Sequence, residues 1–433
     1  MAKMHADGRN LIRPVLPRRG WQREQGFRRG WGGSLWRLTG VAVTSALLVA
    51  CGVSAPGQPG EVPPIATGAE AAPASDSVAV ERASGLHSGA AQAAAEAASA
   101  PVALRWFPVP RIAGRLTSKD LGIVINTADP YSVEVGEYYI RARSLGADQV
   151  LRVELPVRAA LTADEFRAFD RKVTTFFGDR AQALALAWMQ PYAVACNSIT
   201  AALALGFDDE LCKKSCEPPL RHSPYFNSVS TRPHADLGLR PSMLLAADSV
   251  AGAKAMIDRG VAADGTLGQR GAPPVNAYFV QTPDRRRNTR APWFPPPGRV
   301  PKMGIDVHVE TTTALADVDR VLIYLTGAAR VDKLDRVGWV PGGVGDHLTS
   351  FGGALEGRAS QMTALAWIAS GATASYGTVS EPCAHPQKFP HPQVLMLQYA
   401  QGSTVIEAYW KSVAWPQQGV FIGEPLSAPF ARR

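Results

Sequence analysis

The stretch that decides the fold is Leu121-Gly-Ile-Val-Ile-Asn126, which is followed closely by Asp129 and Pro130. The run is short, apolar and rich in β-branched residues, which predicts a buried strand. Asp129 is suited to cap a helix and Pro130 to open its first turn, so we expect a helix over Tyr131–Arg143. A strand that leads directly into a helix is typical of an α/β fold.

The same alternation continues along the chain. A strand is expected over Gln149–Glu154, and Thr162 and Glu165 have the spacing of a capping box ahead of a helix over Phe166–Phe177. Ala183–Val194 should return to the sheet. Later strands are expected at Ser242–Ala247, Ala277–Gln281, Ile305–Glu310, Val321–Leu325, Gly345–Thr349, Ala372–Val379 and Gly419–Ile422, and helices at Ser249–Arg259, Ser360–Ser370, Gln393–Ala400 and Ser403–Val413. We therefore predict a doubly wound α/β domain: a mainly parallel sheet, its strands pointing one way, with helices on both faces.

The positive charge of the chain is concentrated at its N-terminus. Residues 1–50 hold nine of the 45 Lys and Arg and two of the 37 Asp and Glu, which leaves 36 bases and 35 acids in the remainder. A nucleic-acid partner is therefore not expected, because phosphate neutralisation requires basic residues in the folded part. The other basic run, Arg285–Arg287 with Arg290, predicts a solvated loop, with an anion site as the alternative.

The basic segment leads into a short apolar run, Leu38–Ala50, that ends at Cys51. Leu48-Val-Ala-Cys51 resembles the bacterial lipobox, so we expect a lipoprotein signal peptide over residues 1–50 and a lipid anchor to the membrane at Cys51. The alternative is an ordinary signal peptide with an incidental cysteine. Gly52 carries no aspartate-type retention signal, which favours export to the outer membrane, facing the periplasm or the surface. No apolar run approaches the roughly 18 residues of a membrane-spanning helix, so a multi-pass membrane protein is excluded.

Residues 51–103 consist mainly of Ala, Pro, Gly, Ser and Glu, which predicts a flexible, disordered tether. The α/β domain then covers residues 104–433, as one unit or as two half-domains with a break within residues 206–240. The segments 206–240 and 282–302 are long, Pro-rich and poorly periodic, and loops of that length are usually functional or disordered.

Four cysteines follow Cys51: Cys196, Cys212, Cys216 and Cys383. In an exported protein an even count favours two disulfide bonds, of which we favour Cys196–Cys383 with Cys212–Cys216. The alternative is a zinc site, and hence a zinc-dependent hydrolase, with the ligands Cys212, Cys216, His222 and His234, although their spacing departs from common zinc motifs. No cofactor is predicted, since Gly342–Gly345 is a turn without the Gly-Lys-Ser/Thr of a phosphate loop.

The densest group of polar residues runs from Asp346 to His385. Two strands separated by one helix should be parallel neighbours, so the segments Asp346–Ser350 and Glu381–His385 should meet at the carboxyl edge of the sheet, where α/β folds bind ligands. The candidate catalytic residues are His347, Ser350, Glu381, Cys383 and His385. His347 can equally be a satisfied core histidine, Glu381 part of a turn, and Cys383 a disulfide partner.

Several motifs resemble an uncharacterised family of exported bacterial proteins found beside the exosortase/PEP-CTERM sorting system. They lie over residues 117–430 and are Ala-Leu-Gly-Phe before Asp208, Ser223–Ser228, Leu239–Met243, Ile257–Gly260, His347–Gly353, Gly371–Gly377, Glu381–Cys383, Glu407–Trp410 and Gly423–Leu426. The resemblance implies a role in envelope, exopolysaccharide or protein-sorting biology, with a protein or polysaccharide partner, and it implies no established activity.

A second resemblance is to the caspase-like fold of gingipain-type cysteine peptidases. That fold carries a catalytic His-Gly after one strand and a Cys after the next, and the matching positions here are Thr326-Gly327 and Ser350. Without the imidazole, no group at that position would activate a nucleophile. We therefore expect a binding protein with a degenerate peptidase fold, or else a hydrolase that uses Ser350 or Cys383 with His347 or His385.

Overall fold

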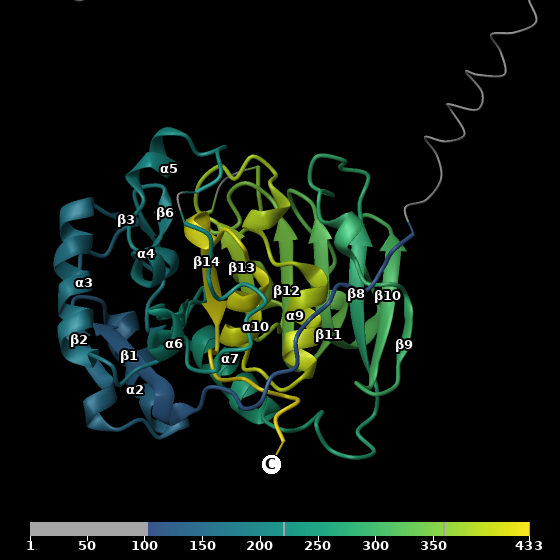
Figure 1. The fold of residues 1–433 in the computed structure, drawn as a ribbon, viewed down its shortest axis with the longest axis horizontal. Helices are drawn as coiled ribbons and strands as arrows, with labels where there is room; N and C mark the ends of the chain where they lie inside the picture. Colours follow the sequence, from purple (N-terminus) through teal and green to yellow (C-terminus); the bar gives the residue numbers. More distant parts are fainter. Residues whose placement is uncertain (1–102, 220, 358–359, 433) are drawn as a thin grey trace, which may run out of the picture. The chain divides into compact units, whose positions relative to one another are not determined.

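The computed structural model describes residues 103–432 except 220, 358 and 359. The predicted signal peptide, Cys51 and nearly all of the predicted tether lie outside the described residues. The first described segment, residues 103–117, has no regular structure and runs along two helices near the C-terminus (Figure 1). It is held there by backbone N–H groups, since Phe107 donates to the Gln393 amide oxygen at 2.5 Å and Leu116 to the Glu407 carboxylate at 3.1 Å.

The centre of the fold is an eleven-stranded sheet in the order β2-β1-β4-β7-β14-β13-β12-β11-β8-β10-β9. Its strands are β1 (Leu121–Asn126), β2 (Val150–Val153), β4 (Ala183–Leu186), β7 (Ser242–Leu244), β8 (Val275–Gln281), β9 (Gly298–Val300), β10 (Ile305–Thr311), β11 (Val318–Gly327), β12 (Val337–Leu348), β13 (Ala374–Thr378) and β14 (Gly419–Gly423). A small second sheet contains β3 (Ala160–Leu161), β5 (Ala193–Val194) and β6 (Asn197–Ser198).

The large sheet is mostly parallel, as predicted, but it is mixed. The β13–β14 and β9–β10 pairs are antiparallel, and the other pairs are parallel. The expectation that all strands point one way is therefore wrong: β2, β1, β4, β7 and β14 run in one direction, β13, β12, β11, β8 and β10 run in the opposite direction, and β9 reverses again at the edge. The chain reaches β14 from helix α10 through a short turn, so it enters at the edge where β13 ends and runs back along β13.

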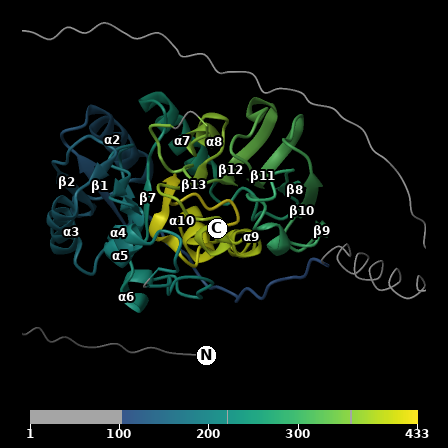
Figure 2. The same cartoon turned by 90° about the horizontal axis from the view of Figure 1, so that it is seen from above.

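Helices cover both faces of the sheet (Figure 2). They are α2 (Pro130–Arg143), α7 (Val250–Ala263) and α8 (Leu365–Ala369) on one side, and α3 (Ala163–Phe177), α4 (Ile199–Leu205), α5 (Asp209–Lys213), α6 (Pro233–Leu237), α9 (Pro392–Ala400) and α10 (Val405–Ser412) on the other. The predicted caps are present: Asp129 accepts a hydrogen bond from the N–H of Tyr131 at 3.0 Å, and Thr162 and Glu165 form a capping box.

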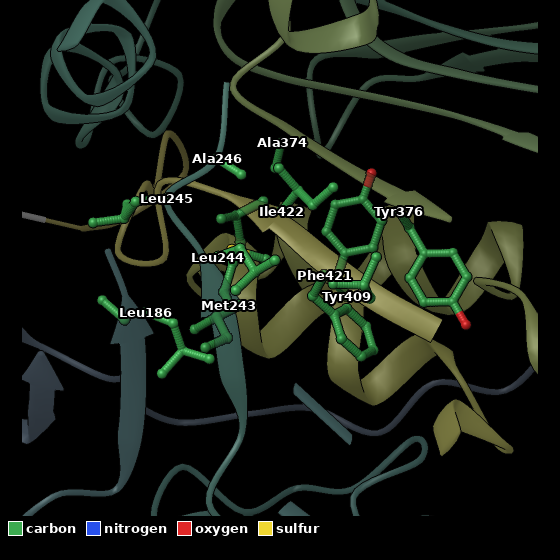
Figure 3. Close-up of a cluster of buried hydrophobic side chains, with 14 of the residues drawn as sticks. Leu186, Met243, Leu244, Leu245, Ala246, Ala374, Tyr376, Tyr409, Phe421 and Ile422 are labelled. Atoms are coloured by element: carbon green, nitrogen blue, oxygen red, sulfur yellow. The ribbon is translucent and has the colours of Figure 1, made fainter. Parts of the chain in front are cut away.

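The core continues across the whole sheet. Figure 3 shows Leu186 of β4, Leu244 of β7, Tyr376 of β13 and Phe421 of β14 packed together, all of them fully buried. Phe421 also stacks on Trp410 of α10 with ring centroids 4.4 Å apart. Burial of this much aromatic and aliphatic surface stabilises the junction where the strand direction changes.

Three local predictions are wrong. Ala183–Val194 is not one strand, because β4 ends at Leu186 and the chain then turns, with the Trp188 indole N–H donating to the carbonyl of Pro191 at 2.9 Å. Helix α8 begins at Leu365 rather than at Ser360, because the N–H groups of Met362 and Ala364 are bonded to other loops. The glycines from Gly342 to Gly345 lie within β12 and form no separate turn.

The four cysteines of the domain form two disulfide bonds, as predicted, but the predicted pairing is wrong. The bonds are Cys196–Cys212 and Cys216–Cys383, each with Cα atoms 5.2 Å apart. Cys196 meets Cys212 because the neighbouring Asn197 amide donates to the carbonyl of Asp208 at 2.8 Å and fixes the start of α5. Since Cys212 is occupied in this way, Cys216 pairs with Cys383 in the loop that follows β13.

Candidate functional site

The carboxyl ends of β11, β12 and β13 lie next to one another, as the sequence predicted. β11 is parallel to β12, and β12 to β13. The two predicted polar segments touch directly, because the Thr378 hydroxyl contacts the carbonyl oxygens of Thr349 and Ser350, each at 3.0 Å. We call this edge, formed by residues 326–327, 346–351 and 378–385, the carboxyl rim.

His347 is the predicted base, and it is a core residue in the structure. Its side chain is 1% exposed, and both ring nitrogens have partners. Nδ1 accepts a hydrogen bond from the indole N–H of Trp367 at 2.9 Å, and Nε2–H donates to the carbonyl of Met362 at 3.0 Å. Burial lowers the pKa of His347 to about 4, so the ring is neutral at pH 7. In this arrangement the imidazole has no free lone pair with which to accept a proton.

The other candidates also serve the structure of the rim. Cys383 is bonded to Cys216 and carries no thiol. The Glu381 carboxylate accepts the N–H of Cys383 at 2.8 Å, and His385 Nε2 lies 2.8 Å from the carbonyl of Cys216, to which it donates. Ser350 is half-buried at the rim, where its carbonyl accepts from Thr378. The rim therefore contains all five candidates along one edge but engages their functional groups, apart from the Ser350 hydroxyl, in structural contacts.

A buried ion pair lies beneath the rim, and the sequence did not predict it. Arg290 and Asp346 are 2% and 0% exposed, with Nη2 and Oδ1 2.6 Å apart. Arg290 also donates to the carbonyl of Thr326 at 2.8 Å and lies over the ring of Phe389. Burial raises the pKa of Asp346, and the Arg290 guanidinium opposes that rise. The prediction that Arg290 belongs to a solvated loop is wrong, since only Arg285 and Arg286 of that run are exposed.

The loop that contains Arg290 covers the rim. The Thr282 hydroxyl donates to the carbonyl of Gly327 at 2.6 Å, and the Arg287 guanidinium donates to the hydroxyl of Thr349 at 3.1 Å. A Cβ atom at Gly327 would lie only 1.9 Å from the carbonyl oxygen of Arg287, so the loop requires glycine there. The loop thus covers Gly327 and Thr349, the neighbours of Thr326 and Ser350 along the chain.

An open pocket lies beside the covered rim, between η3 (Ala291–Trp293), the first turn of α9 and the N-terminal segment. Its volume is about 440 Å³, and it is lined by Ala103, Arg105, Trp106, Phe107, Pro108, Pro292, Trp293, His391 and Gln393. We call it the aromatic pocket. No motif predicted it; the only sequence signal was the length of the Pro-rich loop over residues 282–302.

The rings of the aromatic pocket are held in place by their neighbours. His391 stacks on Trp293 with centroids 4.8 Å apart and planes 12° apart, and it contacts Phe107 at 4.5 Å. The Gln393 amide nitrogen donates to the carbonyls of Arg105 and Trp293 at 2.8 and 3.2 Å, which joins the two sides of the pocket. Burial lowers the pKa of His391 to about 4, so this ring is neutral. Trp106, by contrast, is 47% exposed.

The proposed zinc ligands are not available as a set in this structure. Cys212 and Cys216 are each oxidised with a different cysteine, and His234 Nε2 lies 2.8 Å from the Arg240 guanidinium, which donates to it. His222 packs against Trp415, with ring centroids 5.5 Å apart. Within residues 103–432, apart from the three undescribed positions, no group of three or more His, Cys, Asp or Glu could hold a metal ion.

Comparison with family models, with curated proteins and with solved structures gives no match for this chain. None of the helices in the described part of the chain is long and apolar enough to cross a membrane.

Proposed function

We propose that this protein is a non-catalytic binding protein of the bacterial envelope, exported and anchored through a lipid on Cys51, and that it binds polysaccharide in the aromatic pocket. The α/β domain would be a caspase-like fold kept for binding. The observation that carries the proposal is the contrast between the two sites: the carboxyl rim is covered by its own loop and disulfide, whereas the aromatic pocket beside it is open.

The chemistry of the aromatic pocket suits a sugar chain. Pyranose rings present flat C–H faces that pack on aromatic rings, and Trp106 and Trp293 offer such rings next to the exposed guanidinium of Arg105. Because His391 and Gln393 fix the inner rings, little conformational entropy is lost when a ligand packs against them. Arg105 would add a preference for acidic sugars, since it carries the only charged side chain among the lining residues.

Affinity electrophoresis in native gels tests this proposal. The purified full-length protein is run through gels that contain dextran, xanthan or alginate, and we expect retardation that is greatest in the two acidic polysaccharides. Trp106→Ala should weaken binding roughly five- to tenfold, the equivalent of one aromatic contact of about 1 kcal/mol. Val229→Ala, which removes another exposed apolar side chain, is the matched control and should bind like the wild type. Equal mobility of the wild type and Trp106→Ala in every gel would contradict the proposal.

A further inference from the structure

An open groove lies at the β2 edge of the large sheet, between strand β2 and helix α3. Both views place β2 and α3 side by side at this end (Figures 1 and 2). The groove has a volume of about 750 Å³ and is lined by Leu151 of β2 and by Ala168, Arg171, Lys172, Thr175 and Phe176 of α3. We call it the β2–α3 groove. It shares no residue with the carboxyl rim or with the aromatic pocket.

Strand β2 is an edge strand. Its single neighbour among the described strands is β1, which Leu151 and Val153 face. On the other side the Val150 N–H donates to the carbonyl of Ala147, which leaves the N–H of Arg152 and the carbonyls of Val150 and Arg152 without a partner strand among the described residues. Such an edge accepts an additional strand, because an extended segment can satisfy these backbone groups together. Alternate side chains of the added strand would then point into the groove, where Leu151 and Phe176 supply the apolar surface.

The β2–α3 groove is positively charged, which favours an acidic ligand. Arg171 and Lys172 are both exposed, and neither forms a salt bridge within the described residues. The lining contains no carboxylate. The carboxylate nearest in sequence, Asp170, is half-buried; burial raises its pKa, and the charges of Arg240 and Arg171 only partly oppose that rise. Two unpaired cations beside an unpaired strand edge complement a segment that is extended and acidic.

We propose that the β2–α3 groove binds an acidic segment of a partner protein as an additional strand on β2. The partner contributes backbone hydrogen bonds to the outward-facing groups of β2, and from one face of its strand it places apolar side chains against Leu151 and Phe176 and carboxylates against Arg171 and Lys172. This site is independent of polysaccharide binding, so a single protein can attach to a sugar chain at one end of the sheet and to a protein at the other.

The test is fluorescence anisotropy with full-length protein in detergent and a labelled hexapeptide, Thr-Val-Thr-Glu-Thr-Asp, whose valine, glutamate and aspartate lie on one face of an extended strand. We expect saturable binding that weakens with added salt, and at least tenfold weaker binding to Thr-Val-Thr-Lys-Thr-Lys. The double variant Arg171→Glu/Lys172→Glu should lose at least tenfold in affinity for the acidic peptide. Arg141→Glu, at an exposed arginine of α2 on the other face of the sheet, is the matched control and should bind like the wild type.

Two further measurements separate strand addition from simple charge attraction. A peptide with alternate N-methylated amides should not bind, and hydrogen exchange should show new protection of the Arg152 amide, which faces away from β1, when the unmodified peptide is added. Equal binding of the methylated and unmodified peptides would overturn the proposal. So would protection of the Arg152 amide without added peptide, since that result would assign the edge to a second copy or to another segment of this chain.

Discussion

The buried pair of Arg290 and Asp346 gives the sharpest stability prediction. Arg290→Met replaces the guanidinium by an apolar side chain of similar length and leaves a fully buried carboxylate without its cation. Breaking a buried pair in this way costs about 3–5 kcal/mol, because the remaining charge keeps its desolvation penalty and loses its partner. The Arg290 contact with the carbonyl of Thr326 is lost as well, which favours the upper half of that range.

The assay is urea unfolding of the wild type and variants with their disulfide bonds intact. With a slope of about 3 kcal/mol per molar urea, the Arg290→Met midpoint should fall by at least about 1 M. Without Arg290, burial alone acts on the pKa of Asp346 and raises it above its unfolded value, so the folded carboxyl binds a proton more readily. The free energy of unfolding that Arg290→Met loses relative to the wild type should therefore be small near pH 4. It should grow as the pH rises through the new folded pKa of Asp346 and stay constant above it.

Two variants make the reasoning refutable. Arg290→Met/Asp346→Leu removes both charges and should recover most of the lost free energy of unfolding. Arg167→Met breaks an exposed pair with Asp164 and should cost less than about 1 kcal/mol. A loss below about 1 kcal/mol in Arg290→Met, or a double variant no more stable than the single one, would show that the pair is not buried as described.

The remaining predictions concern other parts of the molecule. The free energy of unfolding should fall as the pH drops from 6.5 to 4, because His347 takes up a proton in the unfolded state but stays neutral in the folded state. With a folded pKa of about 4, this loss is about 3 kcal/mol. His347→Gln should lack this part of the pH dependence in urea unfolding. Gly327→Ala should destabilise the fold by about 3 kcal/mol or more, because its Cβ would overlap the carbonyl of Arg287, whereas Gly252→Ala within α7 should be neutral or slightly stabilising in the same assay. Cys51→Ser should abolish incorporation of an alkyne-labelled fatty acid in growing cells, and labelling that persists in the variant would contradict the lipid anchor.

Much of the fold could be predicted because its elements are encoded locally. The Ile- and Val-rich run of β1, the cap at Asp129 and the capping box at Thr162 act within a few residues, and the structure confirms them. We predicted that β12 and β13 are parallel neighbours because strands joined by a single helix form a parallel crossover, and the structure confirms this pairing. The same rule predicted correctly that their carboxyl ends meet at one edge of the sheet.

Contacts made by the long loops could not be predicted. Arg290 meets Asp346, and Cys216 meets Cys383, only because irregular segments follow particular paths over the rim. The aromatic pocket combines three segments, represented by Phe107, Trp293 and His391, that are far apart in the sequence. Hydrophobic periodicity carries no information about such paths, since it reports only which face of a helix or strand is buried.

A carboxyl rim closed by its own disulfide bond carries no free thiol. Mass spectrometry of the native protein, alkylated before proteolysis and kept unreduced, tests this property. We expect the linked peptides Cys196–Cys212 and Cys216–Cys383, with no alkylated thiol at any of these four positions. A native protein in which Cys383 is alkylated would contradict this expectation, because the rim would then carry a free thiol beside Glu381 and His385.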